Sequence, residues 1–443
     1  MKRVVLQRQK TIKENRPIAH RTPGQKRVIL LGSSGSIGQS ACQVARALPH
    51  HMKLVGFAVS KSTDELLKQI YEFRPEAVSV TDRDAAAAVR KDIPATCKLF
   101  EGEEGLVRLI EEVDADMVLV AIVGTAGLRP ALKAIERRCD LAVASKEILV
   151  MAGEEVMERA FERGIKVLPI DSEHNAIFQC LQNAPNQEVR RLILTASGGP
   201  FRTGVQGVKQ TVQFPAFATV PEKGNGSSKV FERKAQTEAS EFVNVTVEMA
   251  LKHPTWKMGK KITIDSATLF NKGLEMIEAR WLFDIEMARI DVIIHPESIV
   301  HSMVEFVDHS VLAQLSHSDM CFPIQYAVTY PQRLSNPLRP LDFAKLSRLN
   351  FEAPNPKRFP ALRLAREAGT IGGTMPAVMN AANEIAVDAF LNQRGTFPQI
   401  WEMVEAVMSV HNVIKKPSLE EILQADAWAR RTASHFYKNG YFA

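Results

Sequence analysis

Short apolar runs alternate with helical segments from Arg27 onward, and this alternation restricts the possible folds more than any other feature of the sequence. The segments between the apolar runs show helical periodicity, for example at 39–48, 64–73 and 127–138. Strands separated by helices of this length favour a parallel sheet with crossover helices. We therefore predict a Rossmann-like, doubly wound α/β domain over residues 27–170. Its strands are expected to contain the apolar runs 28–31, 54–59, 77–80, 117–123, 141–144 and 166–170.

The middle of the chain, residues 171–330, mixes strand-like and helix-like stretches without regular alternation, which predicts an α+β domain. A helix is expected over NKGLEMIEARWLF. The proline-rich segment 331–360 is predicted to be an extended linker. Residues 361–443 have helical periodicity throughout, which predicts a C-terminal helical bundle. The stretches expected to form strands in the middle domain are RLILTASGG, KITIDSAT, DVIIHPES, SIVHSMVEF and SVLAQLS.

Residues 205–245 differ from the sequence on either side, because their periodicity is weak and they contain the flexible stretch GNGSS. They lie between the motifs SGGPF and HPTW. Long loops within compact domains are often active-site lids. We therefore expect a lid loop over about residues 198–258.

The net charge of the 443-residue chain, +6 at pH 7, comes from its first residues. Residues 1–27 contain nine lysines and arginines and one acidic residue, which leaves a net charge of −2 for the rest of the chain. This distribution argues against a nucleic-acid partner. The same residues contain no serine and no apolar core, so they resemble neither a transit peptide nor a secretory signal. We expect residues 1–26 to form a disordered basic extension.

Composition and cysteine usage indicate a soluble globular protein. Hydrophobic residues make up 45% of the chain and charged residues 24%, and no apolar run approaches the ~18–20 residues of a membrane-spanning helix. The five cysteines are widely spaced, with no C-x-x-C pair, so neither a disulfide framework nor a thiolate zinc site is indicated. We expect a cytoplasmic protein with reduced core cysteines and no membrane partner.

Three glycines, Gly32, Gly35 and Gly38, follow the first predicted strand and precede a helix. Glycines in this context allow a tight turn and bring backbone N–H groups close to a phosphate at the helix N-terminus. The spacing is G-x-x-G-x-x-G instead of the dinucleotide pattern G-x-G-x-x-G. A glycine-rich turn without a ligand therefore stays an alternative.

The end of the second predicted strand, FAVSKST, bears on cofactor choice. Ser60, Lys61 and Ser62 stand where an NAD-specific fold places an acidic residue on the ribose 2′-hydroxyl. A cation and hydroxyl groups there favour the 2′-phosphate of NADP. Asp64, slightly further on, keeps NAD possible.

The stretch VLPIDSEHNAIFQC ends a predicted strand with two acids, Asp171 and Glu173, which point to one side in extended geometry. Ligands bind at the carboxyl ends of parallel strands, and two carboxylates on one side repel each other unless a cation lies between them. The alternative is helix capping, in which Asp171 or Ser172 starts the helix HNAIFQC. Locally the two interpretations are equally good, and both stay open. His174 is interpreted as a structural partner.

A third carboxylate comes from a predicted helix further along the chain. Asn271, Glu275 and Glu278 share one helical face, and Lys272 reaches Glu275 three residues on. Three carboxylates without a nearby cysteine suit Mg²⁺ or Mn²⁺. For Glu278 we favour a salt-bridged position on a surface helix.

The motifs of the chain, taken in order, resemble those of one enzyme family. GSSGSIG, AIVGTAGL, SKEILV, DSEHNAIFQ, SGGPF, HPTWKMG, IDSATLFNKGLE and NAANE occur as in 1-deoxy-D-xylulose 5-phosphate reductoisomerases of the non-mevalonate isoprenoid pathway. The resemblance covers about residues 27–440, apart from most of 205–245. It implies an enzyme that uses NADPH and Mn²⁺ or Mg²⁺ to rearrange 1-deoxy-D-xylulose 5-phosphate to an aldehyde and reduce it to 2-C-methyl-D-erythritol 4-phosphate. It also implies a homodimer.

The resemblance further implies that 27–170 bind NADPH and that 171–330 bind the metal and perform catalysis. Lys146, Glu173 and His253 would take part in catalysis, and the metal ligands would be Asp171, Glu173 and Glu275. The substrate would be held by Lys146, Ser172, Glu173, Ser197, His253, Trp256, Ser266, Asn271, Lys272 and Glu275, with its phosphate on Ser266, Asn271 and Lys272. The NADPH site would be lined by Ser34, Gly35, Ser36, Ile37, Ser60, Lys61, Ser62, Ser145, Glu147, Gly259 and Met320.

Two departures from the family pattern fall at the cofactor. Ser145 stands where the family usually has Asn, and Ser62 where it often has Asn. Two other functions stay open: a metal-dependent NADP hydroxy-acid dehydrogenase and a non-catalytic nucleotide-binding sensor. The presence of all three candidate metal acids and of Lys146 counts against the sensor.

Overall fold

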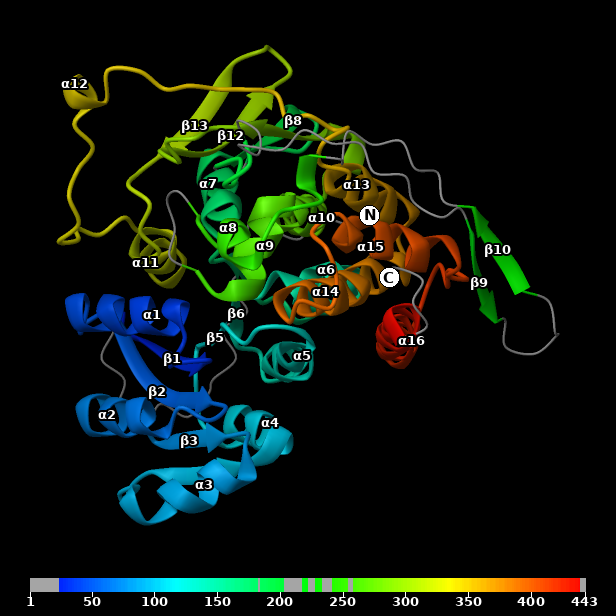
Figure 1. Ribbon diagram of the computed structural model, residues 1–443. Helices are drawn as coiled ribbons and strands as arrows, with labels where there is room; N and C mark the ends of the chain where they lie inside the picture. Colours follow the sequence, from blue (N-terminus) through cyan, green and yellow to red (C-terminus); the bar gives the residue numbers. More distant parts are fainter. Residues whose placement is uncertain are drawn as a thin grey trace.

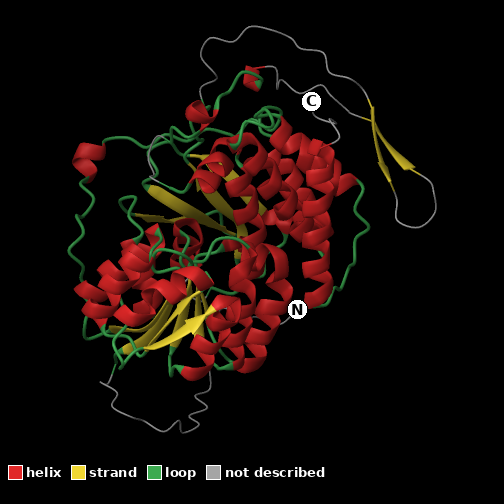
Figure 2. Cartoon of the chain, turned by 60° about the horizontal axis from the view of Figure 1, so that its bottom comes forward, coloured by secondary structure: helices red, strands yellow, loops and turns green. Residues whose placement is uncertain are grey.

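The computed structural model describes residues 24–181, 184–202, 217–221, 228–232, 241–253 and 258–438 (Figure 1). The predicted basic extension falls almost entirely outside these residues, as do parts of the predicted lid loop. A parallel sheet with its helices is followed by a smaller mixed sheet and by a group of C-terminal helices (Figure 2). The predicted fold class is confirmed, and the residue limits of the domains remain predictions.

The first sheet has seven parallel strands in the order β4-β3-β2-β1-β5-β6-β7. The order reverses between β1 and β5, and doubly wound sheets bind ligands at the carboxyl ends of the strands at such a point. Most strand residues are buried, which explains their apolar runs. β4 was not predicted, because this edge strand, KLFE, has only two apolar residues. The strands are β1 Lys26–Leu31, β2 Met52–Val59, β3 Ala77–Val80, β4 Lys98–Glu101, β5 Met117–Val120, β6 Asp140–Val143 and β7 Val167–Pro169.

The turn between β1 and the first helix requires glycine at two positions. Gly32 has φ +87°, and a Cβ there would lie 2.4 Å from the backbone oxygen of Ala121. A Cβ at Gly38 would lie 2.4 Å from the backbone oxygen of Ser33. The chain therefore turns tightly at the carboxyl end of β1 and enters the helix directly. The helices of this region are α1 Ser36–Ala47, α2 Thr63–Phe73, α3 Arg83–Val89, α4 Gly102–Glu112, α5 Leu128–Glu136 and α6 Lys146–Arg163, with 3₁₀ turns at Arg90–Asp92 and Thr125–Gly127.

The second sheet has the strand order β11-β8-β12-β13, with β11 parallel to β8 and the other pairs antiparallel. Helix α7 packs against β12 and β13, and α10 packs against α6 and α9. Strands β9 Phe217–Pro221 and β10 Ser228–Glu232 form a separate hairpin. The other strands are β8 Val189–Ala196, β11 Ile290–Ile294, β12 Val300–Phe306 and β13 Val311–Leu315. The helices are α7 Ser172–Leu181, α8 Val247–Ala250, α9 Lys260–Thr268, α10 Phe270–Phe283 and α11 Cys321–Thr329, with a 3₁₀ turn at Met287–Arg289.

The prediction of a strand over KITIDSAT was wrong, because these residues form α9. The consecutive β-branched residues Ile262, Thr263 and Ile264 favour a strand, but packing of α9 against α10 and α14 (Met375–Leu391) outweighs this propensity. The threonine hydroxyls are satisfied within the helix: Thr263 donates to the backbone oxygen of Gly259 at 2.9 Å and Thr268 to that of Ile264 at 3.0 Å. The four other predicted strands of this region and the helix over NKGLEMIEARWLF are present.

The proline-rich segment is mostly irregular, with one short helix, α12 Phe343–Leu346, and a single β-bridge between Ile294 and Glu352. The C-terminal helices do not form an isolated bundle. α13 packs on α10, α14 packs on α6 and α9, and α16 packs on α6, so the C-terminal region supports the helices that carry the candidate site. Its helices are α13 Ala361–Ile371, α14 Met375–Leu391, α15 Gln399–Ser409 and α16 Leu419–Lys438.

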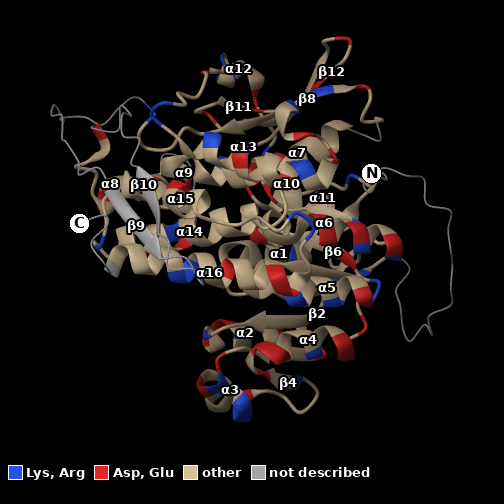
Figure 3. Ribbon diagram, turned by 90° about the vertical axis from the view of Figure 1, so that its right-hand side faces the viewer, with Lys and Arg blue, Asp and Glu red and all other residues tan. Residues whose placement is uncertain are grey.

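All five cysteines are buried, and none of them forms a disulfide bond. Among the described residues, no helix combines the length and the apolar character that crossing a bilayer requires. Acidic and basic residues are interspersed along the described elements (Figure 3).

Helices α10 and α13 approach each other closely at Gly273. A Cβ at Gly273 would lie 2.6 Å from the Cβ of Ala365 and 3.3 Å from the backbone oxygen of Ala361. We expect Gly273→Ala to force the helices apart and to lower the free energy of unfolding, measured by urea denaturation, by about 1–3 kcal/mol. Adding Ala365→Gly removes the clashing methyl group and should recover this loss, less about 1 kcal/mol for a second helical glycine. Unchanged stability of Gly273→Ala would contradict the close approach.

Candidate active site

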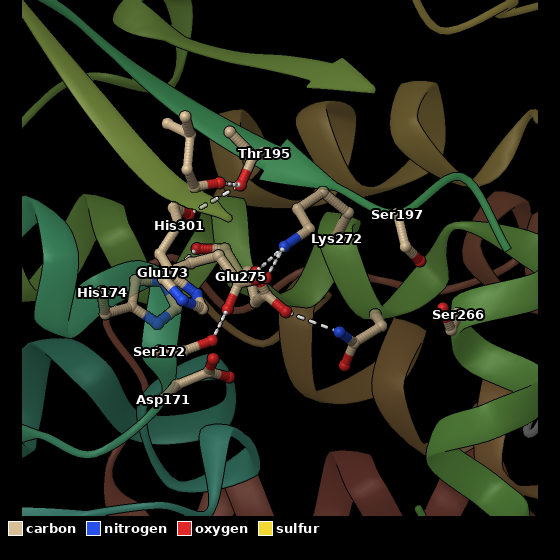
Figure 4. A network of polar contacts seen from close by, with 12 residues as sticks. Asp171, Ser172, Glu173, His174, Thr195, Ser197, Ser266, Lys272, Glu275 and His301 are labelled. Carbon is tan, nitrogen blue, oxygen red and sulfur yellow. Dashed lines mark hydrogen bonds and ion pairs between the residues drawn. The ribbon is translucent and has the colours of Figure 1, made fainter. Parts of the chain in front are cut away.

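The three predicted metal ligands converge from the segment that joins β7 to α7, from the first turn of α7 and from α10 (Figure 4). Asp171 follows β7, Glu173 lies in the first turn of α7, and Glu275 comes from α10. One carboxylate oxygen from each lies within 4.8 Å of the others. The extended geometry expected for Asp171 and Glu173 is wrong, because α7 begins at Ser172. The helix start is confirmed, and the acids still meet because α10 lies opposite this helix start.

Lys146, the first residue of α6, reaches into the acidic cluster. Its Nζ lies 2.7 Å from Asp171 Oδ2 and 3.2 Å from Glu275 Oε1, and it donates to Asn271 Oδ1 at 2.7 Å. Burial alone would lower the pKa of Lys146, but Asp171 and Glu275 raise it well above its usual range. Lys146 is therefore held as an ammonium group at the centre of the site.

Lys272 neutralises the opposite side of the same cluster. Its Nζ donates to Glu173 Oε1 at 2.7 Å and also to Glu275 Oε2. Burial would lower its pKa, but Glu173 and Glu275 outweigh burial and raise it. Asn271 Nδ2 donates to Glu275 Oε1 at 2.5 Å, so the predicted i, i+4 relation on α10 is a hydrogen bond.

The two acids at the start of α7 differ in protonation behaviour. Burial opposes the charge of Asp171, but Lys146 dominates and lowers the pKa of Asp171 below its usual range. Burial and then the nearby Glu275 raise the pKa of Glu173. Ser172 donates a hydrogen bond to the Glu173 carboxylate.

The expectation that Glu278 lies on a surface helix is wrong. Its side chain is fully buried behind the cluster. Its Oε2 lies 3.3 Å from His174 Nδ1, and His174 Nε2 lies 2.9 Å from the backbone oxygen of Glu275. Atoms of Asp171, His174 and Glu278 also lie within 4.8 Å of one another. Burial raises the pKa of Glu278 to about 7. Both ring nitrogens of His174 thus contact α10, and a structural role for His174 stays a prediction.

A second polar group adjoins the acids. His253 Nε2 lies 3.1 Å from Ser197 Oγ and 3.1 Å from Ser266 Oγ. Burial lowers the pKa of His253, which favours the neutral imidazole. Ser197 follows β8 and Ser266 lies on α9. At Gly199, φ is +64° and an added Cβ would lie 2.9 Å from the backbone oxygen of Ser266, so the chain after β8 runs directly past α9.

The three residues predicted to bind the substrate's phosphate therefore belong to two neighbouring sets of contacts. Ser266 belongs to the histidine–serine group, whereas Asn271 and Lys272 contact the acids. Trp256 lies outside the described residues.

The predicted cofactor residues lie mainly at the carboxyl edge of the parallel sheet, where the strand ends meet. Ser34 to Ile37 join β1 to α1, Ser60 to Ser62 join β2 to α2, and Ser145 with Glu147 flanks the start of α6. Lys61 Nζ lies 3.3 Å from Asp82 Oδ2 and is exposed. Gly259 precedes α9, and Met320 precedes α11, which packs on α1.

One set of residues was missed by the sequence analysis. Lys261 Nζ lies 2.7 Å from Asp265 Oδ2 and 3.5 Å from Glu147 Oε1. Asn383, on α14, donates to Asp265 Oδ1 at 2.8 Å. The set links α6, α9 and α14 directly beside Lys146 and Ser266. The i, i+4 spacing of Lys261 and Asp265 indicates an ion pair on a helix. The predicted strand over KITIDSAT hides this spacing.

Comparison with known proteins identifies consistent relatives over nearly the whole chain. A family model described as 1-deoxy-D-xylulose 5-phosphate reductoisomerase matches residues 28–153, and one described as the C-terminal domain of that enzyme matches 167–222 and 226–283. A third, described as DXP reductoisomerase C-terminal domain, matches 315–432.

Curated relatives and solved structures agree with these matches. The 1-deoxy-D-xylulose 5-phosphate reductoisomerase of Bacillus cereus is 47% identical over 92% of this chain and 98% of its own length. That of Thermoanaerobacter pseudethanolicus is 47% identical over 90% and 96%. The solved enzyme of Zymomonas mobilis, in complex with NADPH, has a TM-score of 0.81 and 36% identity, over 94% of this chain and 99% of its own. A DOX-P reductoisomerase structure with NADPH, fosmidomycin and magnesium has a TM-score of 0.80 and 35% identity, over 93% and 98%.

The raised pKa of Glu278 predicts a pH dependence of stability. Because its folded-state pKa of about 7 exceeds the usual carboxyl value, the folded protein binds this proton more tightly than the unfolded chain. The free energy of unfolding should therefore fall as pH rises through the window up to about 7, by about 3 kcal/mol. Glu278→Gln should flatten this decline in urea unfolding measured between pH 5 and 8 with a chelator present. Glu112→Gln, at an exposed position, should keep the wild-type slope, and equal slopes for all three proteins would contradict the assignment.

Proposed function

The chain belongs to the 1-deoxy-D-xylulose 5-phosphate reductoisomerase family, and on this basis we propose how its residues act. The protein is an NADPH- and divalent-metal-dependent enzyme that converts 1-deoxy-D-xylulose 5-phosphate to 2-C-methyl-D-erythritol 4-phosphate. One observation carries the proposed residue roles. Three carboxylates and two lysines form a cluster beside the His253 group and the carboxyl edge of the parallel sheet.

The donor set of the cluster fits a hard divalent cation. Asp171, Glu173 and Glu275 bring oxygen ligands within 4.8 Å of one another, and no cysteine contributes to this cluster of described residues. These three residues would hold Mg²⁺ or Mn²⁺. A cation bound there supplies Lewis-acid polarisation of the substrate's ketone and hydroxyl oxygens.

Lys146 provides a fixed positive charge for the rearrangement. We assign it the role of a cationic group beside the substrate oxygen on which negative charge develops, because its Nζ lies within the cluster, 2.7 Å from Asp171 Oδ2 and 3.2 Å from Glu275 Oε1. A buried ammonium group stabilises such charge more strongly than one in water, because little solvent screens it. Its contacts with Asp171 and Asn271 fix its position before the substrate arrives.

The substrate's phosphate is proposed to bind between the two polar groups of the site. Ser197, His253 and Ser266 offer donors on one side, and Asn271 and Lys272 offer donors on the other. Neutral His253 orients the two serine hydroxyls through Nε2. Binding energy from this phosphate can then hold the reacting carbons in place near Lys146.

The cofactor is proposed to lie along the carboxyl edge of the parallel sheet. Backbone N–H groups of Ser34 to Ile37 at the start of α1 would receive the pyrophosphate, and Lys61 would receive the 2′-phosphate. Bound NADPH supplies the hydride that reduces the aldehyde. Ser145, Glu147, Gly259 and Met320 are proposed to line the part of the site nearer the substrate, because Glu147 directly follows Lys146.

We also propose that the protein works as a homodimer and in the cytoplasm. The family resemblance supports the dimer. The five buried cysteines, none of which forms a disulfide bond, support a reducing compartment.

Turnover tests the function and Glu173 together. Purified protein should oxidise NADPH when given 1-deoxy-D-xylulose 5-phosphate and Mn²⁺ or Mg²⁺, whereas a 2-hydroxy acid with NADP should give no reaction. Glu173→Gln should lower kcat by about 100-fold or more, because a charged ligand becomes neutral. The rate is followed by NADPH absorbance.

Glu112→Gln is the matched control, since it makes the same change on the exposed face of α4. It should retain wild-type kcat. Substantial activity of Glu173→Gln would remove Glu173 from the metal site, and no NADPH oxidation by wild-type protein would overturn the assigned reaction.

The role of Lys61 predicts a change in cofactor preference. Lys61→Met should raise KM for NADPH by about 10-fold while leaving KM for NADH within about twofold, because only NADPH carries the 2′-phosphate. Lys68→Met is the control: Lys68 is equally exposed on α2 and pairs with Glu65 at 3.6 Å. Equal effects of Lys61→Met on both cofactors would contradict the assignment.

A further inference from the structure

Arg358 contacts both ends of a long excursion of the chain. The excursion is residues 203–240, which connect Arg202 to Glu241. Arg358 donates from Nη2 to the backbone oxygen of Phe201 at 2.9 Å and from Nη1 to that of Arg202 at 3.2 Å. Its Nε donates to Glu241 Oε1 at 2.5 Å. One guanidinium group therefore binds the chain on each side of the excursion.

An aromatic cluster surrounds this guanidinium and joins the same two ends. The rings of Phe201 and Phe242 lie 5.9 Å apart and are buried. Arg358 lies over Phe242 at 5.5 Å and over Phe359 at 5.2 Å. Phe397 packs on both Phe201 and Phe242, at 5.2 and 5.7 Å. The two ends are thus fixed on the last residues of the proline-rich segment, which contributes Arg358 and Phe359, and on Phe397 of the C-terminal region.

The fixed ends lead directly to the histidine–serine group. Ser197 lies five residues before Arg202, and His253 lies eleven residues after Phe242. Between Ser197 and Arg202 the chain passes close to α9 at Gly199, where φ is +64° and an added Cβ would lie 2.9 Å from the backbone oxygen of Ser266. The segment before Arg202 and the segment after Glu241 come into contact at the site, where His253 Nε2 lies 3.1 Å from Ser197 Oγ.

We propose that Arg358 is a positioning residue for substrate binding: by holding the two ends of the excursion together it keeps Ser197 and His253 in contact. The entropic cost of keeping two chain ends together grows with the length of the loop between them. The Arg358 contacts offset this cost. A short covalent linker in place of residues 203–240 should offset it equally well. The effect on turnover depends on the proposed function, because Ser197 and His253 are assigned there to the phosphate.

The test compares Arg358 with Arg366, which makes similar contacts elsewhere. Arg366, on α13, donates to the backbone oxygens of Met287 and Ile290 and contacts neither end of the excursion. Arg358→Met should raise KM for 1-deoxy-D-xylulose 5-phosphate by about 10-fold, as expected for lost charge-assisted hydrogen bonds, with KM for NADPH changed less than about twofold. Arg358→Lys keeps the charge and should lie between Arg358→Met and wild type. Arg366→Met should change neither KM.

A deletion variant, in which a four-residue Gly-Ser linker replaces residues 203–240, tests the same role in a second way. With Arg358 intact, this shortened enzyme should keep the wild-type KM, and in the Arg358→Met background it should restore KM to within about threefold of wild type, because the linker now holds the ends. A loss of turnover in the shortened chain with Arg358 intact would overturn the proposal. So would equal increases of both KM values in Arg358→Met, or failure of the linker to rescue it.

Hydrogen exchange without substrate separates this proposal from the proposed function. Arg358→Met should increase amide exchange in 196–202 and 241–253 together, and Arg366→Met should not. If the wild-type protein fails to turn over the substrate, the reaction assignment fails, while the exchange result still decides whether Arg358 holds these segments. Unchanged exchange in either segment would overturn the role of Arg358.

Discussion

The pairing of three carboxylates, of which Glu275 is buried and Asp171 and Glu173 are partly buried, with two buried lysines determines how the helices around the site must be arranged. Removing a charge from water is costly unless an opposite charge lies close to it. Lys146 meets Asp171 and Glu275, while Lys272 meets Glu173 and Glu275. These contacts connect α6, α10 and the start of α7, and a shift of any one of these helices would break at least one of the ion pairs. Helix α13 packs on α10 and α14 packs on α6, so the C-terminal helices support two of the three.

A second chain of polar contacts extends this constraint toward the cofactor edge and the C-terminal helices. Lys261 lies between Glu147, next to Lys146, and Asp265, next to Ser266. Burial would lower the pKa of Lys261, but Asp265 and Glu147 raise it, so it remains a cation that attracts both acids. Asn383 completes the chain from α14. The C-terminal region thus acts on the site through hydrogen bonds as well as through apolar packing.

Residues whose neighbours are close in sequence were the easiest to predict. The glycine turn after β1, the alternation of strands and helices, and the Lys272–Glu275 contact all follow from local spacing. KITIDSAT was misassigned because its helix depends on packing against α10 and α14, which local propensity does not include. Glu278 was placed on the surface for a similar reason: its burial comes from His174, more than a hundred residues earlier in the chain. The contacts of Arg358 with Phe201 and Glu241 are equally non-local, and no spacing indicates them.

The formal charges of the site explain why cation and substrate should bind together. Asp171, Glu173 and Glu275 carry three negative charges against two positive charges on Lys146 and Lys272, which leaves the cluster with a net charge of −1. A phosphorylated substrate is itself an anion, so this cluster alone would repel it. A divalent cation held by the three carboxylates would change the formal net charge of the cluster to +1 and would convert repulsion into attraction. In the proposed mode of binding, the His253 group would receive the phosphate without adding charge, and the positive charge would remain beside the reacting oxygens.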